Sequence, residues 1–360
     1  MEPLAAADIT EGMNAFRRIH LKIVLLVLAG LAALAAGAGV ALAGRTAVPI
    51  GQGVVVIETN LAYQDAAAAG TGIVLTPSGE VLTNNHVIAG ATTVKVVIPN
   101  TGRSYTARVT GYSRTADVAL LQLQNASNLK TLRTGDAAAL TVGQAVRALG
   151  NAGGTGSLSS ASGTITGLSR SITASDDQGN SEQLTGLIET NAGVVAGDSG
   201  GPLLDTTGRI VGMDVAASAS GGFQMVETSD AYAIPIGKAL TIAKQVESGT
   251  SSATVHVGAT AFLGVQVESA ASGGYPGDGY GSTTAGALLA GVIPGGPASS
   301  AGLVPGDVIT AINGRPISSP TVISSIVLKL KPGVKVTITY SDQTGVSQSV
   351  PVTLGSGPPQ

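Results

Sequence analysis

GDSGGPL at residues 197–203 is the stretch that decides the fold, because it sets one serine between glycines ahead of an apolar run. A serine hydroxyl is a weak nucleophile at neutral pH. It becomes reactive when it has a general base, a group that orients the base and donors for an oxyanion. We therefore interpret Ser199 as a candidate nucleophile, and the rest of the chain must supply these partners.

The composition predicts a folded protein rich in short strands. The chain has 360 residues, 44% of them apolar, and a net charge of -3, which argues against disorder and allows roughly two or three domains. The 51 glycines indicate many turns and mainly β structure. With 19 basic against 22 acidic residues and no basic cluster, a nucleic-acid partner is excluded. The absence of cysteine excludes disulfides, thiolate catalysis and Cys-ligated zinc.

The N-terminal region predicts a membrane anchor. Residues 1–22 are polar and end in basic side chains, which is typical of a cytoplasmic tail. Residues 23–43 carry no charge and match the ~20 residues that a helix needs to span the hydrocarbon core. The positive flank lies on the N-terminal side, so the remainder of the chain is predicted to be extracytoplasmic. The alternative is a cleaved signal peptide, because residues 41–43 read ALA.

A base and its orienting acid can be proposed from the first half of the chain. His86 lies near the end of a predicted strand, residues 81–88, and is the histidine best placed to serve Ser199. The alternative is a structural histidine with satisfied hydrogen bonds. Asp117 opens an apolar strand, and a buried carboxylate is costly unless it is hydrogen-bonded or paired. An imidazole is a suitable partner, although Asp117 could instead cap the preceding turn at residues 113–115.

Short strands continue on both sides of these residues. A glycine-rich stretch at residues 150–156 matches neither G-x-G-x-x-G nor a P-loop and is interpreted as a turn. A helix is predicted at residues 237–247. The predicted strands are residues 53–59, 70–76, 81–88, 93–98, 105–112, 117–123, 142–149, 160–168, 184–190, 209–215 and 231–236.

Four segments together resemble the trypsin-like serine proteases, and within them the HtrA (DegP/DegS-like) family. They are TNNHV at 83–87, ADVALL at 116–121, GDSGGPL at 197–203 and AYAIPI at 231–236. The order His, Asp, Ser is that of the chymotrypsin-like double β-barrel. The resemblance implies a catalytic triad of His86, Asp117 and Ser199, with an oxyanion hole from the backbone N–H groups of Gly197 and Ser199. It implies no metal and no organic cofactor.

This chain departs from the family pattern beside the serine. NAGVVA at 191–196 stands where the family usually has DAAINP, and Asp198 stands where many members have Asn. A local hydrogen-bonding role is expected for Asp198. By resemblance, Gly193 occupies the floor of the specificity pocket, and without an acid there we expect cleavage after small or medium apolar residues rather than Lys or Arg. Asp214 on a neighbouring strand could add polarity.

The C-terminal region is similar to a PDZ domain. The similarity rests on FLGV at 262–265 and on GGPASSAGLVPGDVITAING at 295–314. By analogy a peptide carboxylate binds at this first segment while the peptide adds a strand beside an apolar helix. The alternative is that these apolar residues only form the core. The groove residues predicted in this way are Phe262, Leu263, Gly264, Val265, Ile323 and Ile326.

The sequence thus predicts a cytoplasmic tail (1–22), a transmembrane anchor (23–43), a protease domain (44–247), a linker (248–258) and a PDZ domain (259–356). The expected function is a membrane-anchored, extracytoplasmic serine endopeptidase that hydrolyses misfolded or exported proteins, with its PDZ domain binding C-terminal peptides and restraining or stimulating the protease. The alternative is a catalytically silent adaptor or chaperone with the same folds. The HtrA resemblance implies a homotrimer as one option, but with three Phe and no Trp the sequence does not identify aromatic contacts that would hold it, and the oligomeric state stays open.

Overall fold

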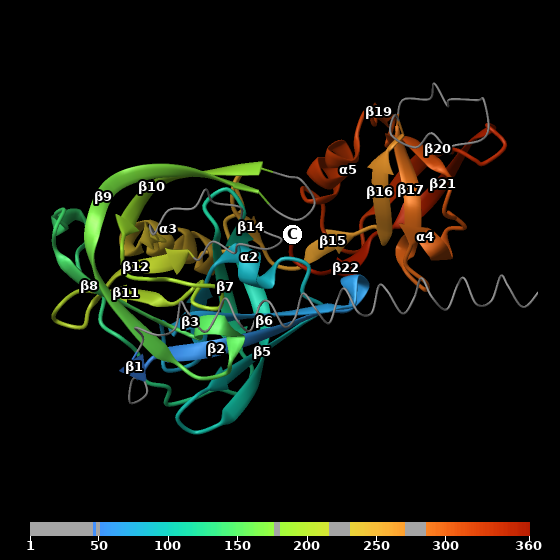
Figure 1. Ribbon diagram of the computed structural model, residues 1–360. Helices are drawn as coiled ribbons and strands as arrows, with labels where there is room; N and C mark the ends of the chain where they lie inside the picture. The colour runs from blue at the N-terminus through green and yellow to red at the C-terminus, as the bar shows by residue number, and fades with distance from the viewer. Residues whose placement is uncertain (1–45, 48–50, 176–180, 216–230, 271–285) are drawn as a thin grey trace, which may run out of the picture. The chain divides into compact units, whose positions relative to one another are not determined.

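The computed structural model describes residues 46–47, 51–175, 181–215, 231–270 and 286–360 (Figure 1). The predicted tail and anchor, residues 1–43, lie outside these ranges. No helix within the described ranges combines the length and the apolar character needed to cross a membrane.

The first β-barrel carries His86 and Asp117. Its strand order is β6-β5-β2-β3-β4-β7, and a β6–β7 pairing closes it. Every one of these pairings is antiparallel, and β5 alternates exposed and buried residues before its end, as a strand with one solvated face does. The interior is filled by branched side chains such as Ile57, Val81 and Leu121. The strands are β2 (Val54–Leu61), β3 (Ala66–Val74), β4 (Glu80–Thr83), β5 (Thr93–Ile98), β6 (Arg103–Ser113) and β7 (Val118–Leu123).

The second β-barrel carries Ser199. Its order is β9-β10-β13-β12-β11-β8, closed by a β8–β9 pairing. Helix α3 (Ile236–Glu247) follows β13 and buries Ala239 and Ala243. The strands are β8 (Ala145–Gly150), β9 (Ser159–Ser175), β10 (Ser181–Thr190), β11 (Pro202–Leu204), β12 (Ile210–Val215) and β13 (Ala231–Pro235), and the remaining short elements before α3 are β1 (Thr46–Ala47), η1 (Ala62–Gln64), η2 (Ala137–Ala139) and η3 (Ala152–Gly154).

The prediction of one continuous strand over residues 81–88 is wrong beyond Thr83. The chain leaves β4 after Thr83 and forms helix α2 (Asn85–Ile88), so His86 lies in a helical turn. The cause is a long-range cap: the carboxylate of Asp117 accepts a hydrogen bond from the backbone N–H of His86 at 2.9 Å. A carboxylate on the free N–H groups of a first turn stabilises a helix that β-branched residues alone would not predict.

The PDZ domain is built on the sheet β16-β17-β18-β20-β21. Two features differ from the prediction. The end of the predicted linker forms β14 (His256–Val257), which pairs with β6 of the first barrel. The strand predicted as the last one, residues 334–340, is followed by β21 (Ser347–Thr353) and β22 (Gly355–Gly357). Strand β21 has mostly exposed, polar residues, so its sequence lacks an apolar alternation.

The remaining elements of this domain are β15 (Thr260–Phe262), β16 (Val265–Ser269), β17 (Ala287–Val292), α4 (Pro297–Ser300), β18 (Val308–Ile312), β19 (Arg315–Pro316), α5 (Pro320–Val327) and β20 (Lys335–Ser341). Strand β22 pairs with β15 outside the main sheet.

Candidate active site

The structure brings His86 and Asp117 into direct contact. Nδ1 of His86 lies 2.8 Å from Oδ2 of Asp117, while Oδ1 of Asp117 accepts the backbone N–H of His86. An ionised carboxylate only accepts hydrogen bonds, so the proton resides on Nδ1 and Nε2 is the acceptor nitrogen of the ring. The Asp117 side chain is 5% exposed and that of His86 is 26% exposed. The acid is therefore shielded, whereas the imidazole reaches the surface of the site.

Asp117 is held in an unusual backbone conformation. Its φ is 53°, in the left-handed region that non-glycine residues rarely occupy. Two bonds fix it there: its N–H donates to the carbonyl of Arg114, and its own carbonyl accepts from Nδ2 of Asn84 at 2.9 Å. The predicted turn before Asp117 is therefore present, and Asp117 both closes this turn and orients His86. Strain that neighbours hold in place in this way is common at functional sites.

The glycines around Ser199 are required by the turn geometry. Gly197 and Gly200 have φ of 93° and 83°. A Cβ at Gly197 would lie 2.2 Å from the carbonyl oxygen of Asn151, and one at Gly200 would lie 2.2 Å from that of Thr71. Neither place has room for a side chain, so the motif allows close approach of three backbone segments.

Ser199 is placed against the first barrel. Its carbonyl oxygen accepts the backbone N–H of Thr71 in β3 at 2.8 Å. At the preceding residue, a Cβ on Gly70 would meet the side chain of Val87 at 2.7 Å and the carbonyl oxygen of Ser199 at 3.3 Å. The serine turn and helix α2 therefore meet at β3, which brings the nucleophile segment next to the residue that follows His86.

The loop ahead of Ser199 is tied down despite its departure from the family pattern. Val195 donates its N–H to Oδ2 of Asp198 at 3.0 Å, so the expected local hydrogen-bonding role of Asp198 is confirmed. The carbonyl of Ala196 accepts from the N–H of Gly153 at 2.8 Å. The N–H of Gly197 donates to no acceptor among the described residues. Gly193 is exposed with a φ of 44°.

Asp214 lies directly behind the serine turn. Its backbone carbonyl accepts from the N–H of Gly200 at 2.9 Å, and its N–H donates to the carbonyl of Gly201 at 2.7 Å. The residue is fully buried. Strand β12 thereby fixes the C-terminal side of the turn.

The predicted groove of the PDZ domain is partly core. Leu263 and Ile323 are each 4% exposed and belong to the domain core, whereas Val265 and Ile326 are half-buried. Phe262 stacks on Tyr63 of η1 with ring centroids 5.4 Å apart. For Leu263 and Ile323 the core alternative is therefore supported, whereas Phe262 is half-buried and stacks on a ring outside that core.

The backbone groups of Leu263 and Gly264 differ in how they are hydrogen-bonded. The carbonyls of Leu263 and Gly264 accept from Ala298 and Ile293, at 3.0 and 2.9 Å. Their N–H groups donate to no acceptor within the described part of the chain. Gly264 has a φ of 80°. Strand β16 pairs with β17 alone among the described strands, which leaves its outer edge open to an added strand.

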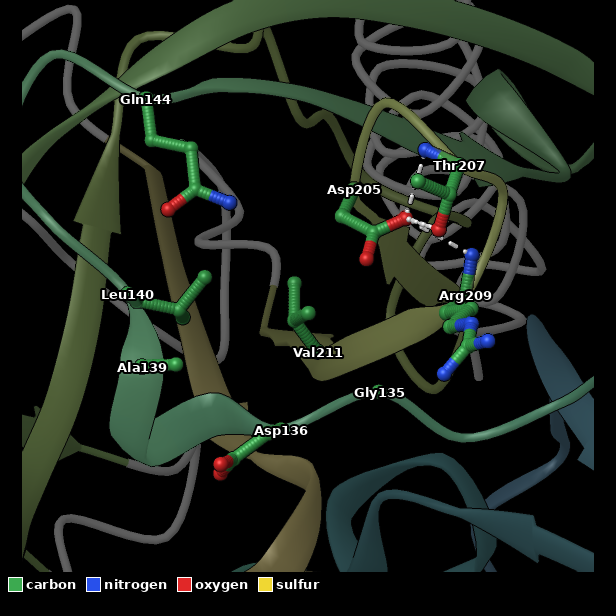
Figure 2. A pocket seen from close by; sticks show the side chains of 9 residues that line it. All are labelled: Gly135, Asp136, Ala139, Leu140, Gln144, Asp205, Thr207, Arg209 and Val211. Carbon is green, nitrogen blue, oxygen red and sulfur yellow. Dashed lines mark hydrogen bonds between the residues drawn. The ribbon is translucent and has the colours of Figure 1, made fainter.

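Two surface hollows lie elsewhere. The one in Figure 2 has a volume of about 290 Å³ and lies on the second barrel, lined by residues such as Leu140, Gln144 and Val211. There Asp205 accepts from Thr207 and Arg209. Burial of the Asp205 carboxyl raises its pKa, but these hydrogen bonds outweigh burial, and the net pKa is lowered. The carboxylate is thus already satisfied by its own turn. Neither hollow is lined by His86, Asp117 or Ser199.

Some residues of the site carry no sequence signal of their own role. Asn84 stands within the TNNHV motif, yet its bond to Asp117 follows only from the fold. Thr71 is an ordinary strand residue in sequence, but it bonds to Gly197 and Ser199. No group of three or more His, Asp or Glu side chains in the described ranges could hold a metal ion.

The fold and the site together define a chymotrypsin-like double barrel followed by a PDZ domain. Comparisons agree with this class. Residues 70–213 match the trypsin-like peptidase domain family, and residues 289–340 match the PDZ domain family.

Named relatives narrow the class. The chain is 32% identical over 319 residues to the serine protease PepD of Mycobacterium tuberculosis, covering 84% of this chain and 63% of that protein. It is 33% identical over 268 residues to the periplasmic pH-dependent serine endoprotease DegQ of Escherichia coli, covering 74% and 55%. A solved HtrA-type protease, AlgW with a tripeptide, matches with 28% identity and a TM-score of 0.47, covering 90% of this chain and 98% of that one. The chain spans 55–63% of the length of these two curated relatives. The protein belongs to the HtrA family of trypsin-like serine proteases.

Proposed function

We propose that this protein is a serine endopeptidase in which His86, Asp117 and Ser199 form the triad. The observation that carries the proposal is the 2.8 Å contact between Nδ1 of His86 and Oδ2 of Asp117, in a barrel whose strand β3 holds the backbone of Ser199. Relatives named as serine proteases support the same activity.

The chemistry follows from the roles of the three side chains. As Oγ of Ser199 bonds to the peptide carbonyl carbon, its proton passes to Nε2 of His86 and the carbonyl electron pair moves onto the oxygen. Asp117 keeps the imidazole oriented and stabilises the imidazolium. Collapse of the intermediate breaks the C–N bond, and His86 returns the proton to the leaving amine. Water then repeats these steps on the acyl-enzyme.

The oxyanion hole of this proposal uses the N–H groups of Gly197 and Ser199. A donor that stabilises an oxyanion must not be consumed by a protein acceptor, and the N–H of Gly197 meets this condition among the described residues. The bond from Gly153 to the carbonyl of Ala196 supports a loop that is fixed before substrate arrives.

Labelling by a fluorophosphonate tests the activity. We expect stoichiometric labelling of the wild-type protein, none of Ser199→Ala, and unchanged labelling of Ser127→Ala, an exposed serine elsewhere on the first barrel. Cleavage of an unfolded protein should fall by roughly 10⁶-fold in Ser199→Ala. A wild-type protein that is never labelled, even with a C-terminal peptide present, would instead be a silent adaptor or chaperone.

The substrates are proposed to be misfolded or exported polypeptides cut after small or medium apolar residues. Gly193, the residue assigned to the pocket floor, has no side chain that could pair with a cation. A peptide library read by mass spectrometry tests this specificity. Strict cleavage after Lys or Arg would refute it and would direct attention to Asp214.

The PDZ domain is proposed to bind C-terminal peptides along β16. Two features of the described residues support this mode: the N–H groups of Leu263 and Gly264 donate to no acceptor there, and β16 pairs only with β17. Fluorescence anisotropy with a peptide and its C-terminally amidated form tests it, because amidation removes only the carboxylate charge. Equal affinity for the two forms would exclude carboxylate recognition. Deletion of residues 259–360 tests whether the domain restrains or stimulates cleavage.

Residues 23–43 are proposed to anchor the protein with its protease and PDZ domains outside the cytoplasm. The uncharged run supports this, as does the word periplasmic in the name of the relative DegQ. Carbonate extraction of membranes and mass spectrometry of the N-terminus provide the test. A soluble protein beginning just after Ala43 would show a cleaved signal peptide. Light scattering would show whether the protein forms the homotrimer that the HtrA resemblance implies or is a monomer.

A further inference from the structure

Thr71 is a fully buried residue of β3 whose hydrogen bonds all serve the serine loop or its surroundings. Its N–H donates to the carbonyl of Ser199 at 2.8 Å. Its hydroxyl donates to the carbonyl of Gly197 at 2.7 Å and accepts from the N–H of Asn151 at 2.9 Å. Its own carbonyl accepts from the hydroxyl of Thr83 at 2.8 Å.

Three separate segments therefore meet at one hydroxyl. Strand β3 belongs to the first barrel, Asn151 to the turn after β8, and Gly197 to the loop ahead of the nucleophile. The neighbouring residue Gly70 packs against Val87 of helix α2. Thr71 thus ties the nucleophile loop of the second barrel to the same strand that supports the helix carrying His86.

The bond to Gly197 matters because glycine does not fix its own backbone. At a φ of 93°, Gly197 can change its dihedral angles without a side-chain clash of its own. The carbonyls on its two sides are both held, that of Ala196 by Gly153 and that of Gly197 by Thr71. The N–H of Gly197 lies in the peptide plane of the Ala196 carbonyl, and the Thr71 bond holds the next plane, so the two bonds together fix the chain on both sides of the Cα of Gly197.

Loss of the hydroxyl would remove one of the bonds that hold the peptide plane between Gly197 and Asp198, whose N–H still donates to the carbonyl of Val195 at 3.0 Å. The carbonyl of Gly197 and the N–H of Asn151 would lose a common partner in a buried place, where an unsatisfied polar group is costly. Rotation of the peptide toward other partners relieves that cost, and it moves the neighbouring N–H groups away from the substrate oxygen.

We propose that Thr71 is a positioning residue of the reaction, whose hydroxyl bridges the N–H of Asn151 and the carbonyl of Gly197 and so holds the oxyanion loop in register with the nucleophile. The inference rests on the proposed serine endopeptidase function. It makes Thr71 a residue that acts through Gly197 and does not itself touch substrate.

The test compares substitutions at Thr71 in the full-length protein. Thr71→Val keeps the shape of the side chain but replaces the hydroxyl with a methyl group, so both of its hydrogen bonds are lost. Thr71→Ala also removes the hydroxyl, without placing a methyl group against the carbonyl of Gly197 and the N–H of Asn151. Thr71→Ser keeps the hydroxyl. Thr59→Val is the matched control, because Thr59 is 3% exposed and its hydroxyl bonds the carbonyl of Ala68 within the β2–β3 hairpin.

The readouts are kcat and KM on a peptide, the inhibition constant of a peptide boronate, and the melting temperature. A boronate bonded to Ser199 places an oxygen in the oxyanion hole, so its affinity reports the geometry of that hole. We expect Thr71→Val and Thr71→Ala to lower kcat and boronate affinity by about 10- to 100-fold with little change in KM. Thr71→Ser should retain the wild-type kcat and boronate affinity. Thr59→Val should change only the melting temperature.

The outcomes separate this inference from the proposed function. An active wild-type protein whose folded Val or Ala variant keeps kcat and boronate affinity would overturn the role of Thr71 and leave the function intact. A lowered melting temperature with unchanged kcat would likewise reduce Thr71 to a structural residue. An inactive wild-type protein that binds no boronate would overturn the function itself. A Val variant that fails to fold leaves the Ala variant to decide.

Discussion

The half of the site that carries the base and the half that carries the nucleophile are held in different ways. His86 and Asp117 follow and precede two adjacent strands, β4 and β7, whose register pairs Thr83 with Ala119. That backbone ladder brings the two residues close together, and bonds within the same barrel fix their side chains. Ser199 lies instead on a glycine-rich turn that other segments hold: β3, the turn after β8, and β12. The base half is therefore built from neighbouring strands, and the nucleophile half from contacts across the two barrels.

The largest effect should come from breaking the base half. Asp117→Asn preserves size but cannot accept from Nδ1 of His86 and the backbone N–H as the carboxylate does. The imidazole then loses its required tautomer, and kcat should fall by about 10⁴-fold, the value known for this change in the trypsin-like triad that serves as the reference case. Steady-state kinetics checks this. A loss below tenfold would show that another group orients His86.

A smaller effect is expected from straining the nucleophile half. Gly197→Ala places a Cβ where the carbonyl oxygen of Asn151 lies 2.2 Å away, at a φ of 93°. The loop must shift, and kcat should fall by about 10²- to 10³-fold, as for loss of one oxyanion donor. Boronate affinity should fall in proportion, because both depend on the same N–H group. Retained boronate affinity would place the oxyanion donors elsewhere.

Asp198 allows a finer comparison within the nucleophile half. Asp198→Asn keeps an oxygen for the N–H of Val195, whereas Asp198→Ala removes it. We expect up to roughly a tenfold larger loss of kcat in the Ala variant than in the Asn variant, since the N–H of Val195 is partly buried and an unsatisfied buried donor costs about 1–3 kcal/mol. Equal kcat in the two variants would mean that the charge of Asp198, and not the bond to Val195, supports the loop.

The sequence could predict residues that stand in local motifs, but not roles that depend on contacts between distant segments. The triad residues stand in short motifs, and the HtrA family predicted from four motifs is confirmed. The helical turn at His86 could not be predicted, because its cap comes from Asp117, which is 31 residues away in sequence and precedes β7. The role of Thr71 depends on contacts with the second barrel that no local pattern encodes. Strand β21 was not predicted because its sequence is mostly polar and exposed and shows no alternation of apolar residues.

The smallest effect should arise where the linker supports the base half from outside. His256 of β14 packs on Tyr112 of β6, with ring centroids 5.0 Å apart. Burial of His256 lowers its pKa below the ordinary value, and the charge of Lys331 adds to this. The unfolded chain then binds the proton before the folded protein does as the pH falls. Stability from His256 is therefore fully present above about pH 6.5 and is lost as the pH falls toward its lowered pKa.

Denaturant unfolding of the wild-type protein and of His256→Gln between pH 5 and 8 measures this loss. The wild-type protein should lose more stability than the variant below about pH 6.5, and the two curves should run parallel above it. At neutral pH the kcat of the variant should match that of the wild type, because the contacts of His256 with the ring of Tyr112 and the carbonyl of Ala259 support the packing of β14 on β6. A steeper loss in the variant than in the wild type would reverse the sign of the linkage. A changed kcat at neutral pH would show that the linker strand reaches the chemistry of the base half and not its stability alone.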